Sequence, residues 1–105
     1  MAKFIILGVL MEIPRQPERC GDNAVAVVFK FAVEQVLDGD VDQELILAAI
    51  PCPELKGEGY FIKNARYRVQ AEADSSTAGE YSIYNEYENE GLEMCWCEVI
   101  EKVSR

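Results

Sequence analysis

The side chains in this chain with the greatest capacity for chemistry are acidic, because 19 residues are Asp or Glu and none is His. Without His, the chain lacks the usual proton shuttle near neutral pH, the base of Ser-His and Cys-His pairs, and the commonest zinc ligand. Neighbouring carboxylates at Asp38 and Asp40, or at Glu86 and Glu88, have the chemistry for proton transfer or metal binding, but the sequence identifies no partner for them. Because the Walker A loop, the nucleophile elbow and the dinucleotide fingerprint are also missing, we expect a protein that is not an enzyme and needs no cofactor.

The four cysteines are the next candidates, either as metal ligands or as disulfide partners. Structural zinc sites usually take paired ligands in a C-x₂₋₄-C pattern, whereas Cys95 and Cys97 form a C-x-C and Cys20 and Cys52 stand alone. On a strand, Cys95 and Cys97 would share one face and Trp96 would lie on the other. Because buried Cys packs as a small hydrophobic side chain, we expect core packing and no metal site.

An apolar run over residues 4–13 follows Lys3 and raises the question of an export signal. The residues after it begin with Pro14 and Arg15 and lack the small side chains of a cleavage site. Glu12 interrupts the run, which is also far shorter than a membrane-spanning helix. We therefore interpret the run as a strand and expect a cytoplasmic protein without a membrane segment, in which the cysteines stay reduced.

Residues 80–90 have the most unusual composition in the chain, because tyrosines alternate there with carboxylates. Tyrosine offers a large contact area at a low entropic cost, and clustered carboxylates attract a basic partner and speed its encounter. We therefore predict that this segment contacts another protein; the alternative is a solvated edge whose rings pack on the fold. The predicted contact residues are Tyr81, Tyr84, Tyr87, Glu86 and Glu88.

A second set of residues suits a different ligand: Tyr60, Lys63, Arg66 and Arg68. On one strand face, the tyrosine could stack on a base or a sugar and the cations could contact phosphates, as in barrels that bind oligosaccharides or nucleic acids. The formal net charge of −9 repels a phosphate backbone, so we expect nucleic-acid binding to be the weaker alternative. The same charge allows a third alternative, in which carboxylates imitate the phosphates of a nucleic acid.

The elements that must position these residues are short apolar segments separated by Gly, Pro and Asp. A chain of 105 residues that is 50 % hydrophobic fits a single domain over residues 1–105. Residues 60–73 alternate between apolar and polar side chains and predict a strand. Strands are also expected over residues 3–13 and 43–50, and a short or irregular one over residues 81–87.

Two segments fit both helical and strand periods. Over residues 24–37, apolar positions recur at helical spacing. Alternation from Val25 to Val33 and the richness in Val and Phe nevertheless favour a strand. We expect this strand to bend near Gln35 and to end at a hairpin turn over Asp38-Gly-Asp40. Residues 92–103 are also expected to form a strand. The sequence therefore predicts an all-β fold, a small antiparallel Greek-key barrel of five or six strands, with an α+β fold that has helices at 24–37 and 92–103 as the alternative.

The order of the segments over residues 4–71 resembles the netrin-like, or TIMP-type, variety of the OB-fold. The matching features are a first strand with a central Gly8, a long second strand ending over residues 29–40, a third strand leading to Cys52, and a strand that runs from Gly59 through Tyr67-Arg-Val69. The resemblance implies a five-stranded barrel that is used mainly for binding proteins. The chain begins Met-Ala-Lys and lacks the N-terminal cysteine and disulfide framework of that family, so the resemblance implies no inhibitory site.

Overall fold

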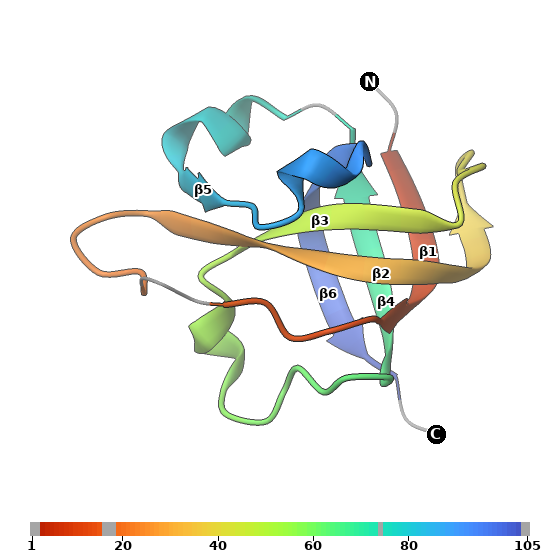
Figure 1. Cartoon of the computed structure of the whole chain (residues 1–105), viewed down its shortest axis with the longest axis horizontal. Helices are drawn as coiled ribbons and strands as arrows, with labels where there is room; N and C mark the ends of the chain where they lie inside the picture. Colours follow the sequence, from red (N-terminus) through yellow and green to blue (C-terminus); the bar gives the residue numbers. More distant parts are fainter. Residues whose placement is uncertain (1–2, 16–18, 74, 104–105) are drawn as a thin grey trace.

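The computed structural model describes residues 3–15, 19–73 and 75–103, and these residues form six β-strands and three short 3₁₀ helices, with no α-helix (Figure 1). The strands are β1 (Lys3–Leu10), β2 (Val25–Asp38), β3 (Leu45–Pro51), β4 (Arg66–Glu72), β5 (Ser82–Tyr84) and β6 (Met94–Lys102). The 3₁₀ helices are η1 (Pro53–Lys56), η2 (Ser76–Glu80) and η3 (Glu88–Glu90). None of the helices in the described ranges is long and apolar enough to span a bilayer.

Five of the strands close into a barrel in the order β1-β4-β6-β3-β2, with β2 pairing back to β1. β2 makes this closure because its residues 26–32 pair with β3 and its residues 31–38 pair with β1. The β1–β2 register skips Glu34, since Leu7 lies opposite Gln35 and Gly8 opposite Val33. The predicted bend near Gln35 is therefore confirmed, and the bulge lets one strand belong to both sides of the barrel.

The all-β, OB-like barrel predicted from the sequence is confirmed, and the helical alternative for residues 24–37 and 92–103 is wrong, because β2 and β6 occupy these ranges. One detail needs correction: the sheet is mixed and not antiparallel throughout. β3 pairs with β6 in parallel, and so does β2 with β5. Parallel neighbours require a long connection, and both pairs have one, because β4 and β5 lie between β3 and β6 in the chain, and β3 and β4 lie between β2 and β5.

The turn at the end of β2 also differs from the predicted tight hairpin. Ala32 is the last residue of β2 that pairs with β3, opposite Leu45, and the strand then continues along β1 to Asp38. Gly39 follows with a φ of +82°, and a Cβ at this position would lie 2.6 Å from the carbonyl oxygen of Lys3. Only glycine fits there, because both the backbone conformation and the close approach of β1 exclude a side chain.

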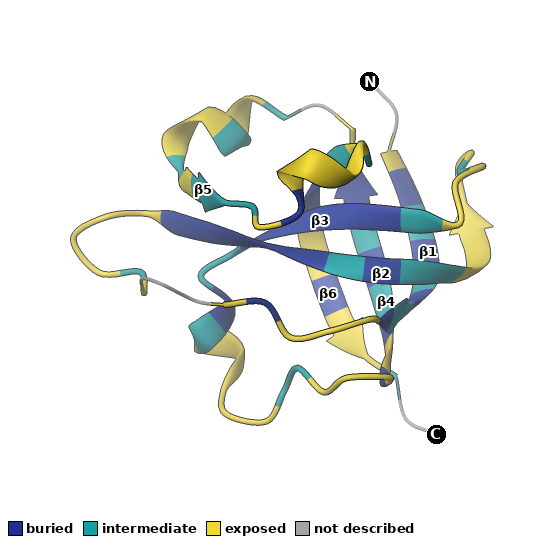
Figure 2. Cartoon of the chain, in the orientation of Figure 1, coloured by how far each residue is buried: buried dark blue, intermediate teal, exposed yellow. Residues whose placement is uncertain are grey.

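The barrel interior is filled by the inward side chains of all five strands. Figure 2 shows that buried residues occur along these strands. The alternation predicted for β2 and β4 is confirmed, since Phe29, Phe31, Tyr67 and Val69 are fully buried. Cys95 and Cys97 of β6 also point inward. The members of this core are Phe4, Ile6, Leu10, Val25, Val27, Phe29, Phe31, Ile46, Ala48, Ile50, Ala65, Tyr67, Val69, Ala71, Cys95, Cys97 and Ile100.

A second apolar cluster lies on the outer face of β2, β3 and β6. Residues 75–93, which we call the cover segment, pack over this face with η2, β5 and η3. Trp96 is on this side of β6, as the alternation with Cys95 and Cys97 predicts. The cluster consists of Ala26, Val28, Leu47, Ala49, Tyr87 and Trp96, with Ala78, Tyr81, Ile83, Leu92 and Met94 against it.

Candidate functional site

The cover segment is held to the barrel by its inner side chains and by one short strand. Tyr81 packs on Trp96, with 4.9 Å between the ring centroids. β5 extends the sheet by pairing in parallel with the start of β2. Near the other end of the segment, Lys30 Nζ of β2 lies 2.6 Å from Glu90 Oε1. The segment that stands out by its composition is therefore fixed at several points along its length.

Tyr87 belongs to the interior and not to the contact surface that the sequence predicts. Its side chain is 2 % exposed and packs in the second cluster, with Lys30 Nζ 5.5 Å from the centre of its ring. Burial, and then the carboxylates of Glu12, Glu86 and Glu90, raise the pKa of the Tyr87 hydroxyl above its ordinary value. The prediction fails for Tyr87 because the apolar outer face of the sheet needs a cover, and a ring buried in that cover does not reach a partner.

The other predicted contact residues lie nearer to the surface. Glu86 and Glu88 are exposed, whereas Tyr81 and Tyr84 are half-buried. Glu86 Oε1 accepts a hydrogen bond of 2.7 Å from the backbone N–H of Arg15, a neutral donor that leaves the charge of the carboxylate in place. We call Tyr81, Tyr84, Glu86 and Glu88 the acidic surface, since they combine carboxylates with partly covered rings.

The alternative ligand face is divided between a loop and a strand. The sequence predicts one strand over residues 60–73, but β4 begins only at Arg66. Tyr60 and Lys63 lie before it, Tyr60 in an irregular stretch and Lys63 in a turn, while Arg66 and Arg68 lie on the outer face of β4. The four residues therefore do not form the continuous row that a single strand face would give.

The two arginines and the tyrosine ring of this alternative face already contact other groups of the chain. Arg66 and Arg68 form ion pairs with carboxylates at 2.9 and 3.2 Å. The Tyr60 hydroxyl donates to a backbone carbonyl of β6 at 3.1 Å, and the ammonium groups of Lys56 and Lys102 lie 5.5 and 5.0 Å from the centre of its ring. A base or a sugar would have to displace these cations to stack on Tyr60.

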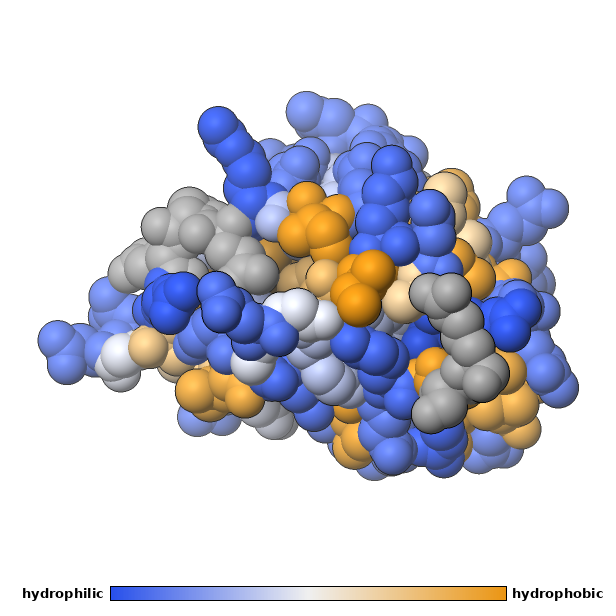
Figure 3. Space-filling model, turned by 90° about the horizontal axis from the view of Figure 1, so that it is seen from below, coloured by the Kyte–Doolittle hydropathy of each residue, from blue (hydrophilic) through white to orange (hydrophobic). Residues whose placement is uncertain are grey.

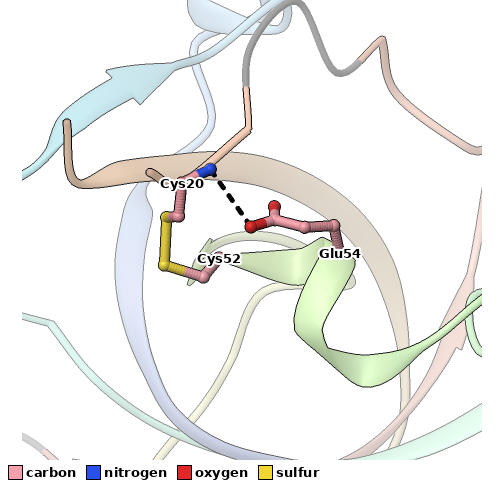
Figure 4. Close-up of side chains that lie close together, drawn as sticks. All are labelled: Cys20, Cys52 and Glu54. Atoms are coloured by element: carbon pink, nitrogen blue, oxygen red, sulfur yellow. Dashed lines mark hydrogen bonds between the residues drawn. A yellow bond between two sulfur atoms is a disulfide. The ribbon is translucent and has the colours of Figure 1, made fainter. Parts of the chain in front are cut away.

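Cys20 and Cys52 form a disulfide, with their Cα atoms 5.4 Å apart (Figure 4). The expectation of reduced thiols is therefore wrong for this pair, because the loop after β1 returns to the end of β3 and brings the two residues together. Cys95 and Cys97 are free and buried in the core, as predicted. Burial raises the pKa of each of these two thiols to about 12, which keeps them protonated and unreactive.

Glu54 of η1 completes a cluster with this disulfide that we do not predict from the sequence (Figure 4). Its Oε2 accepts a hydrogen bond of 3.1 Å from the backbone N–H of Cys20, and its Oε1 is buried with no hydrogen-bond partner among the described residues. The two sulfur atoms and a carboxylate oxygen of Glu54 lie within 4.8 Å of one another. The run Cys52-Pro-Glu54 is visible in the sequence, but nothing in the sequence shows that Cys20 lies beside it.

A cavity of about 490 Å³ lies next to this cluster. Glu54 and Pro53 line it together with Arg19, Glu58 and Phe61, among other residues. Figure 3 views the molecule from the side of η1 and the residues that lead to β4, where hydrophobic side chains gather near the middle and hydrophilic ones surround them. The cavity gives solvent or a small ligand space beside the Glu54 side chain.

A second cavity, of about 400 Å³, has a mixed acidic and apolar lining. Asp40 and Asp42, which follow β2, line it together with Phe4, Glu93 and Met94, among other residues. Within the described ranges, the carboxylates of this cavity do not converge into a group that could hold a metal ion, whereas the disulfide cluster does.

Two features of the structure are therefore candidates for function. The acidic surface has the charge and the rings for recognition of a partner, and the Cys20, Cys52 and Glu54 cluster has donor atoms for chemistry. Comparison with known proteins adds no relative, because no protein-family model, no curated protein and no solved structure matches the chain.

Proposed function

We propose that the chain is a non-enzymatic, OB-like binding module that recognises the basic surface of another protein through the acidic surface of its cover segment. One observation carries the proposal: the inner side of the segment is fixed to the barrel, while Glu86 and Glu88 are exposed on it. A surface that is ordered before binding loses less conformational entropy when a partner arrives. Its carboxylates add electrostatic steering and specificity for positive charge.

The position of the cover segment also favours a protein partner over a nucleic acid or a sugar. OB-folds take such ligands on the face of their second and third strands, between the loops that join strands one to two and four to five. In this chain the outer face of β2 and β3 carries Tyr87 and the rest of the second cluster instead of an open platform. This occupancy supports recognition on the outside of the cover segment.

We also propose that the protein is cytoplasmic and that its barrel is of the netrin-like variety of the OB-fold. The apolar run after Lys3 is β1 of the barrel, which fits a structural role for it and agrees with a cytoplasmic protein. The Cys20–Cys52 disulfide is more typical of an oxidising compartment. Labelling of free thiols in intact cells, before lysis, measures which state of this pair is present and so decides between the two compartments.

The binding experiment compares two variants that remove the same amount of charge. Glu86→Gln/Glu88→Gln changes the acidic surface, and Asp40→Asn/Asp42→Asn is the control, because these two aspartates are exposed elsewhere. The probe is a short arginine-rich peptide, titrated at low and at physiological salt. We take each of the two exposed carboxylates to contribute about 0.7 kcal/mol to the binding free energy. Their removal then predicts about a tenfold loss of affinity for the first variant, and the control should lose much less.

Equal losses in the two variants would mean that the peptide responds only to net charge, and the proposal would then fail. A single-stranded oligonucleotide is titrated in parallel. Tight, salt-sensitive binding of the oligonucleotide together with no binding of the peptide would favour the alternative face around Tyr60.

A further inference from the structure

Three donor groups from two parts of the chain meet at the end of β3. Cys20 lies in the loop before β2, Cys52 directly follows β3, and Glu54 belongs to η1. Their two sulfur atoms and a carboxylate oxygen all lie within 4.8 Å of one another (Figure 4). Two thiolates and one carboxylate are a ligand set that zinc accepts, with a fourth position left for water.

One oxygen of the Glu54 carboxylate lacks a hydrogen-bond partner within the described ranges in the disulfide form. Its Oε1 is buried and has no hydrogen-bond partner among the residues that the structure describes. A buried carboxylate oxygen without a donor or a cation is unfavourable, because it has lost its hydration and gained nothing in return. A cation bound by the Glu54 carboxylate and the two sulfur atoms would compensate that loss.

Backbone donors already orient the prospective ligands. The N–H of Cys20 donates to Glu54 Oε2 at 3.1 Å, and the N–H of Val25 points to Cys20 Sγ at 3.3 Å. An N–H directed at sulfur stabilises a thiolate more than a neutral disulfide sulfur, because it favours the charged form. Such outer contacts hold metal ligands in position and raise the affinity of a site.

We propose that reduction of the Cys20–Cys52 disulfide by a dithiol converts this cluster into a zinc site. The dithiol transfers two electrons and two protons to the disulfide, which becomes two thiols, and is itself oxidised to a disulfide. Zinc then displaces one proton from each thiol and binds the two thiolates and the Glu54 carboxylate. The cavity that Glu54 lines has room for a water molecule as the fourth ligand.

The proposal gives the same two cysteines a role in either redox environment. Under oxidising conditions the loop before β2 is fastened to the end of β3 by the disulfide. Under reducing conditions a metal ion fastens the same two points. The zinc site does not depend on the acidic surface, so its failure would leave the proposed partner recognition untouched.

The test uses Co²⁺ as a spectroscopic substitute for Zn²⁺ on the full chain, reduced with a phosphine that supplies no thiol ligand. We expect one Co²⁺ per chain, thiolate-to-cobalt charge-transfer absorption, and displacement by Zn²⁺. The disulfide form should show none of this absorption. Glu54→Gln should weaken binding at least about tenfold, Cys20→Ser/Cys52→Ser should abolish the absorption, and Cys95→Ala/Cys97→Ala should keep it.

The folding of every variant is checked by circular dichroism. The proposal is overturned if the reduced, folded protein shows no charge-transfer absorption, if Glu54→Gln binds as well as the unmodified chain, or if the absorption follows Cys95 and Cys97. Should reduction unfold the barrel, added Zn²⁺ must refold the unmodified chain and not the Cys20→Ser/Cys52→Ser variant. Failure to refold it also overturns the proposal.

Discussion

Loss of the Cys20–Cys52 link should remove a large part of the stability of the barrel. The two cysteines are separated by 32 positions, so the disulfide closes a long loop in the unfolded chain. For a loop of this length, the chain-entropy relation gives about 12 cal mol⁻¹ K⁻¹, which corresponds to about 4 kcal/mol at 25 °C. For a domain of this size, we expect the melting temperature to fall by about 15 °C.

The measurement is urea unfolding in the presence of a metal chelator, followed by the fluorescence of Trp96. This residue is the only tryptophan of the chain, and it is buried against Tyr81. Oxidised and reduced protein are compared, and Cys20→Ala/Cys52→Ala serves as the control because it has no disulfide to reduce. The control should unfold like the reduced protein and should not respond to reductant. A difference below about 1 kcal/mol between oxidised and reduced protein would refute the loop-closure reasoning.

Three other predictions follow from packing, backbone conformation and ionisation. Tyr87→Ala should lower the free energy of unfolding by about 3 kcal/mol because it empties the space under the cover segment, whereas Tyr87→Phe should change it by about 1 kcal/mol or less; urea unfolding measures both. Gly39→Ala should lower the free energy of unfolding by at least about 1 kcal/mol, and by clearly more than Gly91→Ala. Both glycines have a positive φ, but only at Gly39 would a Cβ lie against β1. Equal losses of stability in the two variants would contradict this contact. Burial raises the pKa of Cys95 and Cys97 to about 12, so their contribution to stability is complete below pH 9 and is lost as the pH rises toward 12. The fall in stability over that range should be smaller in Cys95→Ala/Cys97→Ala, and an unchanged fall would assign it to other groups.

The strands of the barrel could be predicted because their side chains alternate. The buried odd-numbered residues from Val25 to Phe31 and from Ala65 to Ala71 all face the barrel interior. This arrangement gives a period of two residues that is visible within each short stretch of sequence. The helical stripe in β2 arises because Ala26 and Val28 are apolar as well. These residues face the second cluster, so both sides of the strand are buried and two periods fit the same sequence.

The parts of the site that could not be predicted depend on contacts between distant residues. Cys20 and Cys52 come together only because the loop before β2 returns to the end of β3. Tyr87 stands among polar residues in the sequence, and its burial follows from the apolar face that lies beneath it. The composition of residues 80–90 does distinguish the segment, but it cannot show which of its side chains point inward.

The short strand β5 has a consequence for the behaviour of shortened forms of the protein. It pairs with residues 25–27 of β2, whereas β1 pairs only with residues 31–38. Without β5, residues 25–27 of β2 would present unpaired backbone N–H and C=O groups next to an uncovered apolar sheet face. That combination invites a second copy of the chain to add its own strand, so a version trimmed of residues 75–93 should form fibres or precipitate.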